Sequence, residues 1–164
     1  MLILGLDPGS RHTGFGLVRQ RGQTLEAVDY GRITARSGAP LPERLAAIVG
    51  DLEELLDTLS PAVVAIESTF LGMNPRSLVV LSQARGALLG VVGRRGLRVF
   101  EYAPAEVKNA VTGNGRADKS QVSQMVQVLL GLPPDRLPED STDALAVAIC
   151  CAHRRTIDSL TKGP

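Results

Sequence analysis

Four acidic residues of this sequence stand where carboxylates could act together on a bound ion. Asp7 and Glu67 each directly follow a run of five apolar residues, which has the length of a buried strand. Asp140 and Asp143 are three residues apart at the start of a predicted helix, so their side chains share one face of it. Carboxylates at the ends of buried strands need a cation or hydrogen bonds to compensate their charge. The four acids therefore predict a cation site.

The chemistry that such a site predicts is hydrolysis of a phosphodiester bond. Carboxylate oxygens are hard ligands, which suit Mg²⁺ or Mn²⁺ better than zinc. Two such ions, about 3.5–4 Å apart, can activate a water, orient the phosphate and stabilise the leaving 3′ oxygen. Taken singly, Asp140 could instead cap its helix, and Asp7 could belong to the turn before Pro8. It is the combination of the four acids that favours a metal site.

The pattern of apolar residues predicts an α/β fold to position these acids. Three strands come first, at residues 2–6, 14–19 and 24–33. Helices and strands then alternate, with a helix at 41–59, a strand at 62–66, a helix at 77–92 and a strand at 97–102. Three further helices follow, at 104–111, 119–130 and 140–155. This order predicts a five-stranded mixed sheet with helices on both faces.

The predicted sheet brings two of the acids to one edge. Ligands of such sheets bind outside the C-terminal ends of the strands. If the first and fourth strands are parallel neighbours, Asp7 and Glu67 emerge at the same edge. The helix at 77–92 is so rich in apolar residues that we expect much of its surface to be buried. We expect one domain over residues 1–158 and a short C-terminal tail over residues 159–164.

The composition is that of an ordinary globular protein and excludes nucleic-acid binding through bulk charge. The formal net charge is +1, so basic residues would have to be concentrated on one face to bind DNA. The first apolar run is too short for a signal peptide and no later segment spans a membrane, so we expect a cytoplasmic protein. Cys150 and Cys151 are adjacent, which favours two reduced, small apolar side chains over a disulfide.

Five segments of the sequence resemble, in the same order, those of one known family. They are Gly5–Gly16, Ala65–Phe70, Gln83–Gly86, Lys119–Val122 and Asp140–Ala148. Together they resemble the RuvC family of Holliday junction resolvases, and the resemblance covers nearly the whole chain. It implies an RNase H-like fold and a homodimer that places Mg²⁺-dependent nicks symmetrically in two strands of four-way junction DNA. It also implies a role in homologous recombination and DNA repair in the bacterial cytoplasm, with the RuvA–RuvB branch-migration complex as partner.

The resemblance also assigns roles to the four acids. The catalytic acids of the family correspond in this chain to Asp7, Glu67, Asp140 and Asp143. Some members of the family have His at the position that matches Asp140, whereas this chain keeps the acid. The resemblance therefore implies that the four residues bind two Mg²⁺ ions per subunit, with Mn²⁺ able to substitute.

Five further residues are candidates for contacts with DNA. Lys108 and Lys119 match lysines that act in DNA binding and cleavage in the family, and Arg116 lies near Lys119 and could touch the same backbone. Phe70 lies in a predicted loop, where the family has an aromatic residue that stacks on an unpaired base at the crossover. Arg76 belongs to the same loop and could contact phosphate.

Three other functions compete with this one. The segment Asp7–Gly16 also resembles the phosphate loop of sugar kinases and actin-like ATPases, but those folds need two lobes and 164 residues supply one. A nuclease of the same fold that processes ribosomal RNA precursors would prefer structured RNA over junction DNA. A non-catalytic junction-binding module would bind four-way junctions without nicking them. ATP binding, substrate preference and metal-dependent nicking separate these alternatives.

Overall fold

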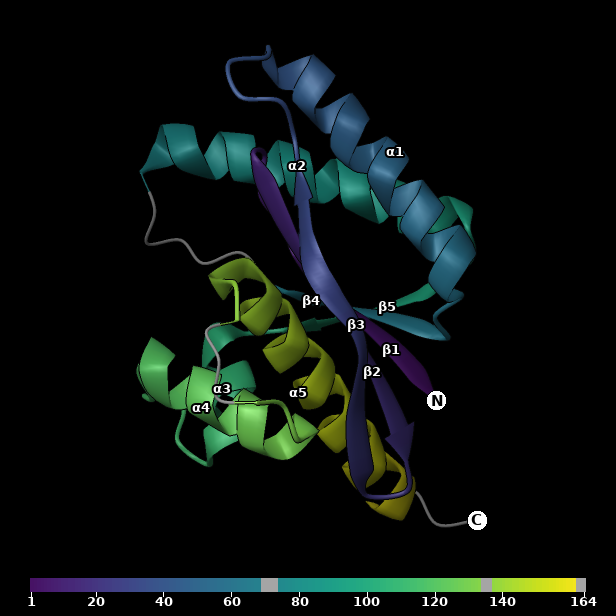
Figure 1. The fold of residues 1–164 in the computed structure, drawn as a ribbon, viewed down its shortest axis with the longest axis vertical. Coiled ribbons are helices and arrows are strands. Elements are labelled where there is room, and N and C mark those ends of the chain that lie inside the picture. The colour runs from purple at the N-terminus through teal and green to yellow at the C-terminus, as the bar shows by residue number, and fades with distance from the viewer. Residues whose placement is uncertain (69–73, 134–136, 162–164) are drawn as a thin grey trace.

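The computed structural model describes residues 1–68, 74–133 and 137–161, with side chains to residue 155, and places one sheet between two groups of helices (Figure 1). The sheet has five strands: β1 (Leu2–Asp7), β2 (His12–Arg21), β3 (Thr24–Thr34), β4 (Val63–Glu67) and β5 (Arg98–Tyr102). Their order is β3-β2-β1-β4-β5. β1 is antiparallel to β2 and parallel to β4, and β4 is parallel to β5. The predicted five-stranded mixed sheet is confirmed.

Helices cover both faces of this sheet, as predicted (Figure 1). They are α1 (Leu41–Leu59), α2 (Pro75–Arg94), α3 (Pro104–Thr112), α4 (Lys119–Leu130) and α5 (Glu139–Thr161). α1 and α4 begin and end where the sequence predicts, whereas α5 continues past Arg155 to Thr161. Cys150 and Cys151 are free thiols buried in α5, as expected. In the part of the chain that the structure describes, no helix is both long and apolar enough to cross a membrane.

Alternation of side chains along β1 and β4 directs both strand-end acids to one face of the sheet. Leu4 and Leu6 pack in the core formed with α1 and α2, so Asp7 faces the opposite side. In the same way Ile66 packs in that core, and Glu67 faces away from it. Both carboxylates therefore lie on the face that α3, α4 and α5 cover.

Glycines in the strands allow α5 to lie very close to the sheet. A Cβ atom at Gly5 of β1 would lie 1.9 Å from the carbonyl oxygen of Ala144, and one at Gly14 of β2 would lie 1.9 Å from that of Asp140. Side chains at these positions would force α5 away from the strands. Because Asp7 is paired with Gly14 between β1 and β2, this close approach brings the first turn of α5 beside Asp7.

The prediction that the helix at 77–92 is buried over much of its surface is wrong for the single chain. The buried residues of α2 are Ala84, Arg85, Leu88, Val91 and Val92. Val79, nearer the start of the helix, is 58% exposed. A helix packed on one face of a sheet buries a single stripe of its surface, so apolar residues outside that stripe stay exposed.

Candidate active site

Four carboxylates from three elements lie around the C-terminal end of β1. Asp7 ends β1, Glu67 ends β4, and Asp140 and Asp143 lie in the first turns of α5. The pKa of Asp7 is raised from 3.8 to about 7, first by burial and then by the negative charges of Asp143, Asp140 and Glu67. The four acids therefore share one region of strongly negative potential, which a cation would stabilise.

The pKa values of two other acids are raised for the same reasons. Burial is the largest cause for Glu67, followed by the charge of Asp143. Burial is again the largest cause for Asp143, and the charge of Asp140 adds to it. The positive charges of Lys108 and Lys119 lower both pKa values and so offset part of this cost.

Basic residues of α4 and β3 form ion pairs with two of the acids. Lys119 is paired with Glu139, and its Nζ lies 3.8 Å from the Oδ2 of Asp143. Lys119 is the first residue of α4, whose start is fixed by Asp118, the capping residue. On the other side, Arg32 of β3 lies 3.5 Å from the Oδ2 of Asp140. Two of the four carboxylates are thus paired with cations of the chain itself.

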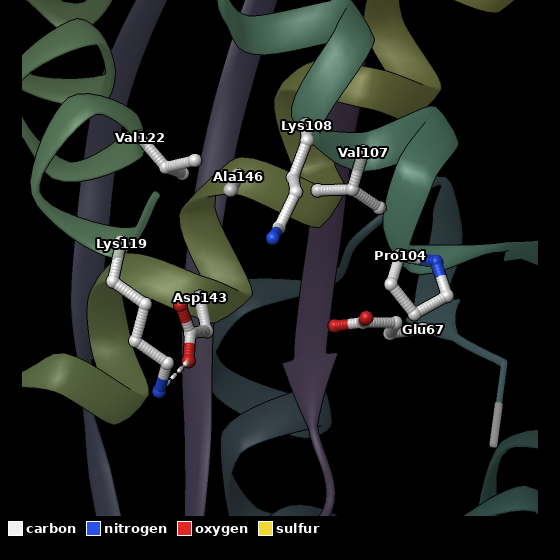
Figure 2. A pocket seen from close by; sticks show the side chains of 8 residues that line it. All are labelled: Glu67, Pro104, Val107, Lys108, Lys119, Val122, Asp143 and Ala146. Atoms are coloured by element: carbon white, nitrogen blue, oxygen red, sulfur yellow. Dashed lines mark ion pairs between the residues drawn. The ribbon is translucent and has the colours of Figure 1, made fainter. Parts of the chain in front are cut away.

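A pocket of about 130 Å³ opens between these groups (Figure 2). Its lining residues are Glu67, Pro104, Val107, Lys108, Lys119, Val122, Asp143 and Ala146. In Figure 2 the ammonium group of Lys108 and the carboxylate of Glu67 both point into the space in front of α5. The lining combines two carboxylates and two lysines with four apolar residues, so it can bind a charged ligand that also has apolar surface.

The donor set fits a hard divalent cation. All four acids offer oxygen ligands, and a bound cation would offset the burial and the like charges that raise the pKa of Asp7. Among the described residues, no three acidic, His or Cys side chains stand around a common point as metal ligands. Asp140 and Asp143 are instead paired with Arg32 and Lys119.

Sequence reasoning missed several residues that shape this site. Arg32 lies on β3 opposite Gly14 of β2, so its role depends on the register of a hairpin and has no motif of its own. Thr13 is buried, and its hydroxyl donates to the carbonyl oxygen of Gly9 at 3.0 Å, which braces the turn that follows Asp7. Only the hairpin register, had it been predicted residue by residue, could have pointed to Arg32.

Comparison with known proteins identifies the family. The family model described as crossover junction endodeoxyribonuclease RuvC matches residues 3–151. The chain belongs to the RuvC family. A RuvC relative from Geobacter sp. (strain M21) is 48% identical over 163 residues, which cover 99% of each chain. The structure of Thermus thermophilus RuvC in complex with a Holliday junction substrate has a TM-score of 0.90 and 31% identity, with 96% of each chain covered. The yeast mitochondrial Holliday junction resolvase Ydc2 shares the fold, with a TM-score of 0.70 at 12% identity over 95% of this chain and 80% of that one.

Membership of the RuvC family confirms the fold and the function predicted from the sequence. The fold is RNase H-like, and the protein is a Holliday junction resolvase, an endodeoxyribonuclease that acts on crossover junctions. The alternatives of an ATPase, an RNA-processing nuclease and a non-catalytic module are therefore wrong. As a RuvC nuclease the protein also depends on a divalent metal.

The predicted DNA-contacting residues fall into three groups. Lys108 and Lys119 line the pocket beside the acids. Arg76 and Arg116 are exposed, the first at the start of α2 and the second in the turn before α4, and neither is among the described residues that line the pocket. Phe70 lies outside the residues that the structure describes.

Proposed function

We propose that this Holliday junction resolvase cuts DNA with divalent metal held by four carboxylates: those of Asp7, Glu67, Asp140 and Asp143. The observation that carries the proposal is the placement of the acids: Asp7 and Glu67 end neighbouring parallel strands, and Gly14, opposite Asp7, lies against Asp140 in the first turn of α5. Buried carboxylates of like charge cost stability that a bound cation would offset, and the raised pKa of Asp7 is consistent with that cost. The proposed ions are two Mg²⁺ per subunit, for which Mn²⁺ can substitute.

When bound, the metal supplies activation of a water and neutralisation of charge on the scissile phosphate. The residues of the chain would bind the DNA strand, stabilise charge and exclude water. Lys119 and Lys108 line the pocket, where their ammonium groups would bind the phosphate backbone and offset the negative charge that develops during cleavage. The apolar wall, which includes Val107 and Val122, would exclude water from one side of the bound strand.

Contacts farther along the junction are assigned to the exposed basic residues and to one aromatic residue. Arg76 and Arg116 would bind phosphates outside the pocket, because both are basic and exposed. Phe70 would stack on an unpaired base at the crossover. These contacts would fix the position of the junction without reading its sequence.

The assembly proposed for cleavage is a two-fold homodimer, because two equivalent cuts need two equivalent sites. The exposed apolar residues of α2, such as Val79, support a contribution of this helix to the interface. The RuvA–RuvB branch-migration complex is the proposed partner, and the bacterial cytoplasm is the proposed location.

The proposed function is tested with a synthetic four-way junction incubated with Mg²⁺, Mn²⁺ or EDTA. We expect paired, symmetric nicks with either metal and none in EDTA. The products should carry 5′-phosphate and 3′-hydroxyl ends, so DNA ligase should seal them. Cleavage that persists in EDTA, or ends that ligase does not seal, would contradict the proposed mechanism.

Replacing Lys119 by Ala is expected to weaken both binding and cleavage of the junction. If Lys119 contacts a phosphate, the slope of log affinity against log salt concentration should fall by about one unit. The slope can be measured by fluorescence anisotropy with Ca²⁺ or EDTA in place of Mg²⁺. An unchanged slope together with slow cutting would instead assign Lys119 to stabilisation of charge in the transition state.

A further inference from the structure

A buried arginine lies behind the pocket and contacts the strand that carries Glu67. Arg85 of α2 is 9% exposed and belongs to the segment Gln83–Gly86, to which no role has been assigned above. Its Nη1 donates to the main-chain carbonyl oxygen of Glu67 at 2.6 Å. Its Nη2 donates to the Oε2 of Glu101 at 2.5 Å. One guanidinium group thus joins α2 to the C-terminal ends of two neighbouring strands.

This arrangement depends on the shape of the guanidinium group. Arginine presents several N–H donors in a rigid plane, so it can bind two acceptors at once in a fixed geometry, which a lysine ammonium group does less well. A charge is retained in a buried position only where such contacts compensate its lost hydration. Here the carboxylate of Glu101 supplies the opposite charge, and the carbonyl of Glu67 supplies the second acceptor.

Arg85 and the carboxylate of Glu67 lie on opposite faces of the sheet. α2 covers the face into which Ile66 packs, whereas the carboxylate of Glu67 points into the pocket on the other face (Figure 2). Arg85 therefore contacts the main chain of Glu67 on one face of the sheet, while the side chain of Glu67 points into the pocket on the other face. One residue further on, the amide of Ser68 donates to the carbonyl oxygen of Tyr102 at 2.8 Å, which ties the same strand end to β5.

We infer that Arg85 is a positioning residue for Glu67, which it orients by clamping the end of β4 to β5 through Glu101. The inference rests on the proposed function, in which the carboxylate of Glu67 is a metal ligand. Displacement of a functional group by about 1 Å can reduce the rate by about 100-fold, so a clamp on the main chain of a ligand residue affects activity directly.

Two other ion pairs, at the C-terminal end of α2, do not involve the strands that carry the candidate ligands. Arg94 is paired with Glu53 and Arg95 with Asp57, and both pairs join the end of α2 to α1 at the surface. Neither pair contacts a strand end that carries a candidate ligand. Arg94 therefore offers a matched control, because it is an ion-paired arginine on the same helix but remote from the pocket.

The inference is tested by comparing Arg85→Lys with Arg94→Lys. Lysine keeps the charge but cannot bridge both acceptors, so Arg85→Lys should raise the Mn²⁺ concentration needed for half-maximal cleavage by about 10-fold or more. The Mn²⁺ affinity of the free protein, measured by calorimetry without DNA, should fall by a similar factor. Arg94→Lys should change neither quantity by more than about 2-fold.

A second readout is the exchange rate of the Ser68 amide hydrogen. Loss of the clamp should loosen the end of β4, so the exchange rate of this amide should rise by about 10-fold in Arg85→Lys relative to amides in the middle of β1. A purely global loss of stability would raise the exchange rates of both sets of amides together. Local loosening therefore distinguishes a positioning role from a merely structural one.

A milder variant keeps the test decisive if Arg85→Lys does not fold. Glu101 is half exposed, and Glu101→Gln removes the charged partner while Arg85 still contacts Glu67. We expect it to raise the half-maximal Mn²⁺ concentration by about 3-fold and the Ser68 exchange rate by a similar factor. Folded variants that match wild type in metal dependence and in Ser68 exchange would overturn the inference. A wild type that cuts no junction with any metal would instead overturn the proposed function.

Discussion

The variant Asp7→Asn is expected to lose nearly all junction cleavage and yet to unfold at a higher temperature than wild type in EDTA. Removal of one metal ligand costs several kcal/mol of charge stabilisation in the reaction, which corresponds to about 10³-fold or more in rate. Without metal, however, burial and, after it, repulsion by the charges of the other three acids raise the pKa of Asp7 to about 7. A neutral amide of the same size removes that repulsion.

The pH dependence of stability follows from the direction of this shift. The pKa of Asp7 is higher in the folded chain than its ordinary value of 3.8, so the folded state binds the proton more tightly than the unfolded state. The stability of wild type should therefore fall as the pH rises from about 4 to about 7. A rise of the pKa to about 7 corresponds to at most about 4 kcal/mol, and Asp7→Asn lacks this loss.

Thermal melts of the two proteins in EDTA at pH 5 and pH 8 test this prediction. We expect Asp7→Asn to melt about 4 °C or more above wild type at pH 8, with a smaller gap at pH 5. Excess Mg²⁺ should narrow the gap at pH 8, because the metal binds folded wild type better than the variant. Asp51→Asn, which changes an exposed acid of α1, serves as the control. A lower melting temperature for Asp7→Asn in EDTA would mean that hydrogen bonds stabilise this carboxylate and that the site is not strained.

A second large effect is expected from Gly5→Ala, in the centre of the sheet. The added methyl group would lie 1.9 Å from the carbonyl oxygen of Ala144 and 3.0 Å from the main-chain nitrogen of Ala148. Both atoms belong to the backbone of α5, so no side-chain movement can relieve the overlap. The helix would have to move away from β1, at a cost of about 3 kcal/mol in the free energy of unfolding.

The displacement should also reduce cleavage, because α5 carries Asp140 and Asp143. We expect Gly5→Ala to melt about 6–12 °C below wild type and to cut the junction at least about 10-fold more slowly at a temperature where it is folded. Gly50→Ala is the matched control, since a Cβ atom at this position of α1 meets nothing within 4 Å. That variant should be as stable as wild type or more stable by up to about 1 kcal/mol, because alanine favours helix. Equal melting temperatures for Gly5→Ala and wild type would show that α5 does not lie as close to β1 as described.

The sequence predicts the strand-end acids of this site because their signals are local. Asp7 and Glu67 directly follow apolar runs, so each is expected at the end of a strand, and the two acids emerge together if those strands are parallel neighbours. β1 and β4 are indeed parallel neighbours, with Leu6 opposite Ile66. The side on which each carboxylate emerges also follows from simple alternation along the strand.

The features of the fold and of the site that could not be predicted depend on contacts between segments that are distant in the sequence. Gly5 and Gly14 give no sign in the sequence that the last helix of the chain needs the space above them. Arg85 stands among apolar residues of a helix, and one of its acceptors is a main-chain carbonyl, which has no sequence signature. The exposed stretch of α2 could not be predicted because apolar content alone does not say how much of the surface of a helix is covered.

The most direct test that the four carboxylates form one metal site is a measurement of the Mn²⁺ affinity of the free protein. Electron paramagnetic resonance of Mn²⁺ should show that wild type binds the ion in the absence of DNA. Affinity should fall by about 10-fold or more in each of four variants: Asp7→Asn, Glu67→Gln, Asp140→Asn and Asp143→Asn. Asp51→Asn should bind Mn²⁺ as wild type does. If two or more of the four variants also bind Mn²⁺ as tightly as wild type, the four carboxylates do not form one metal site.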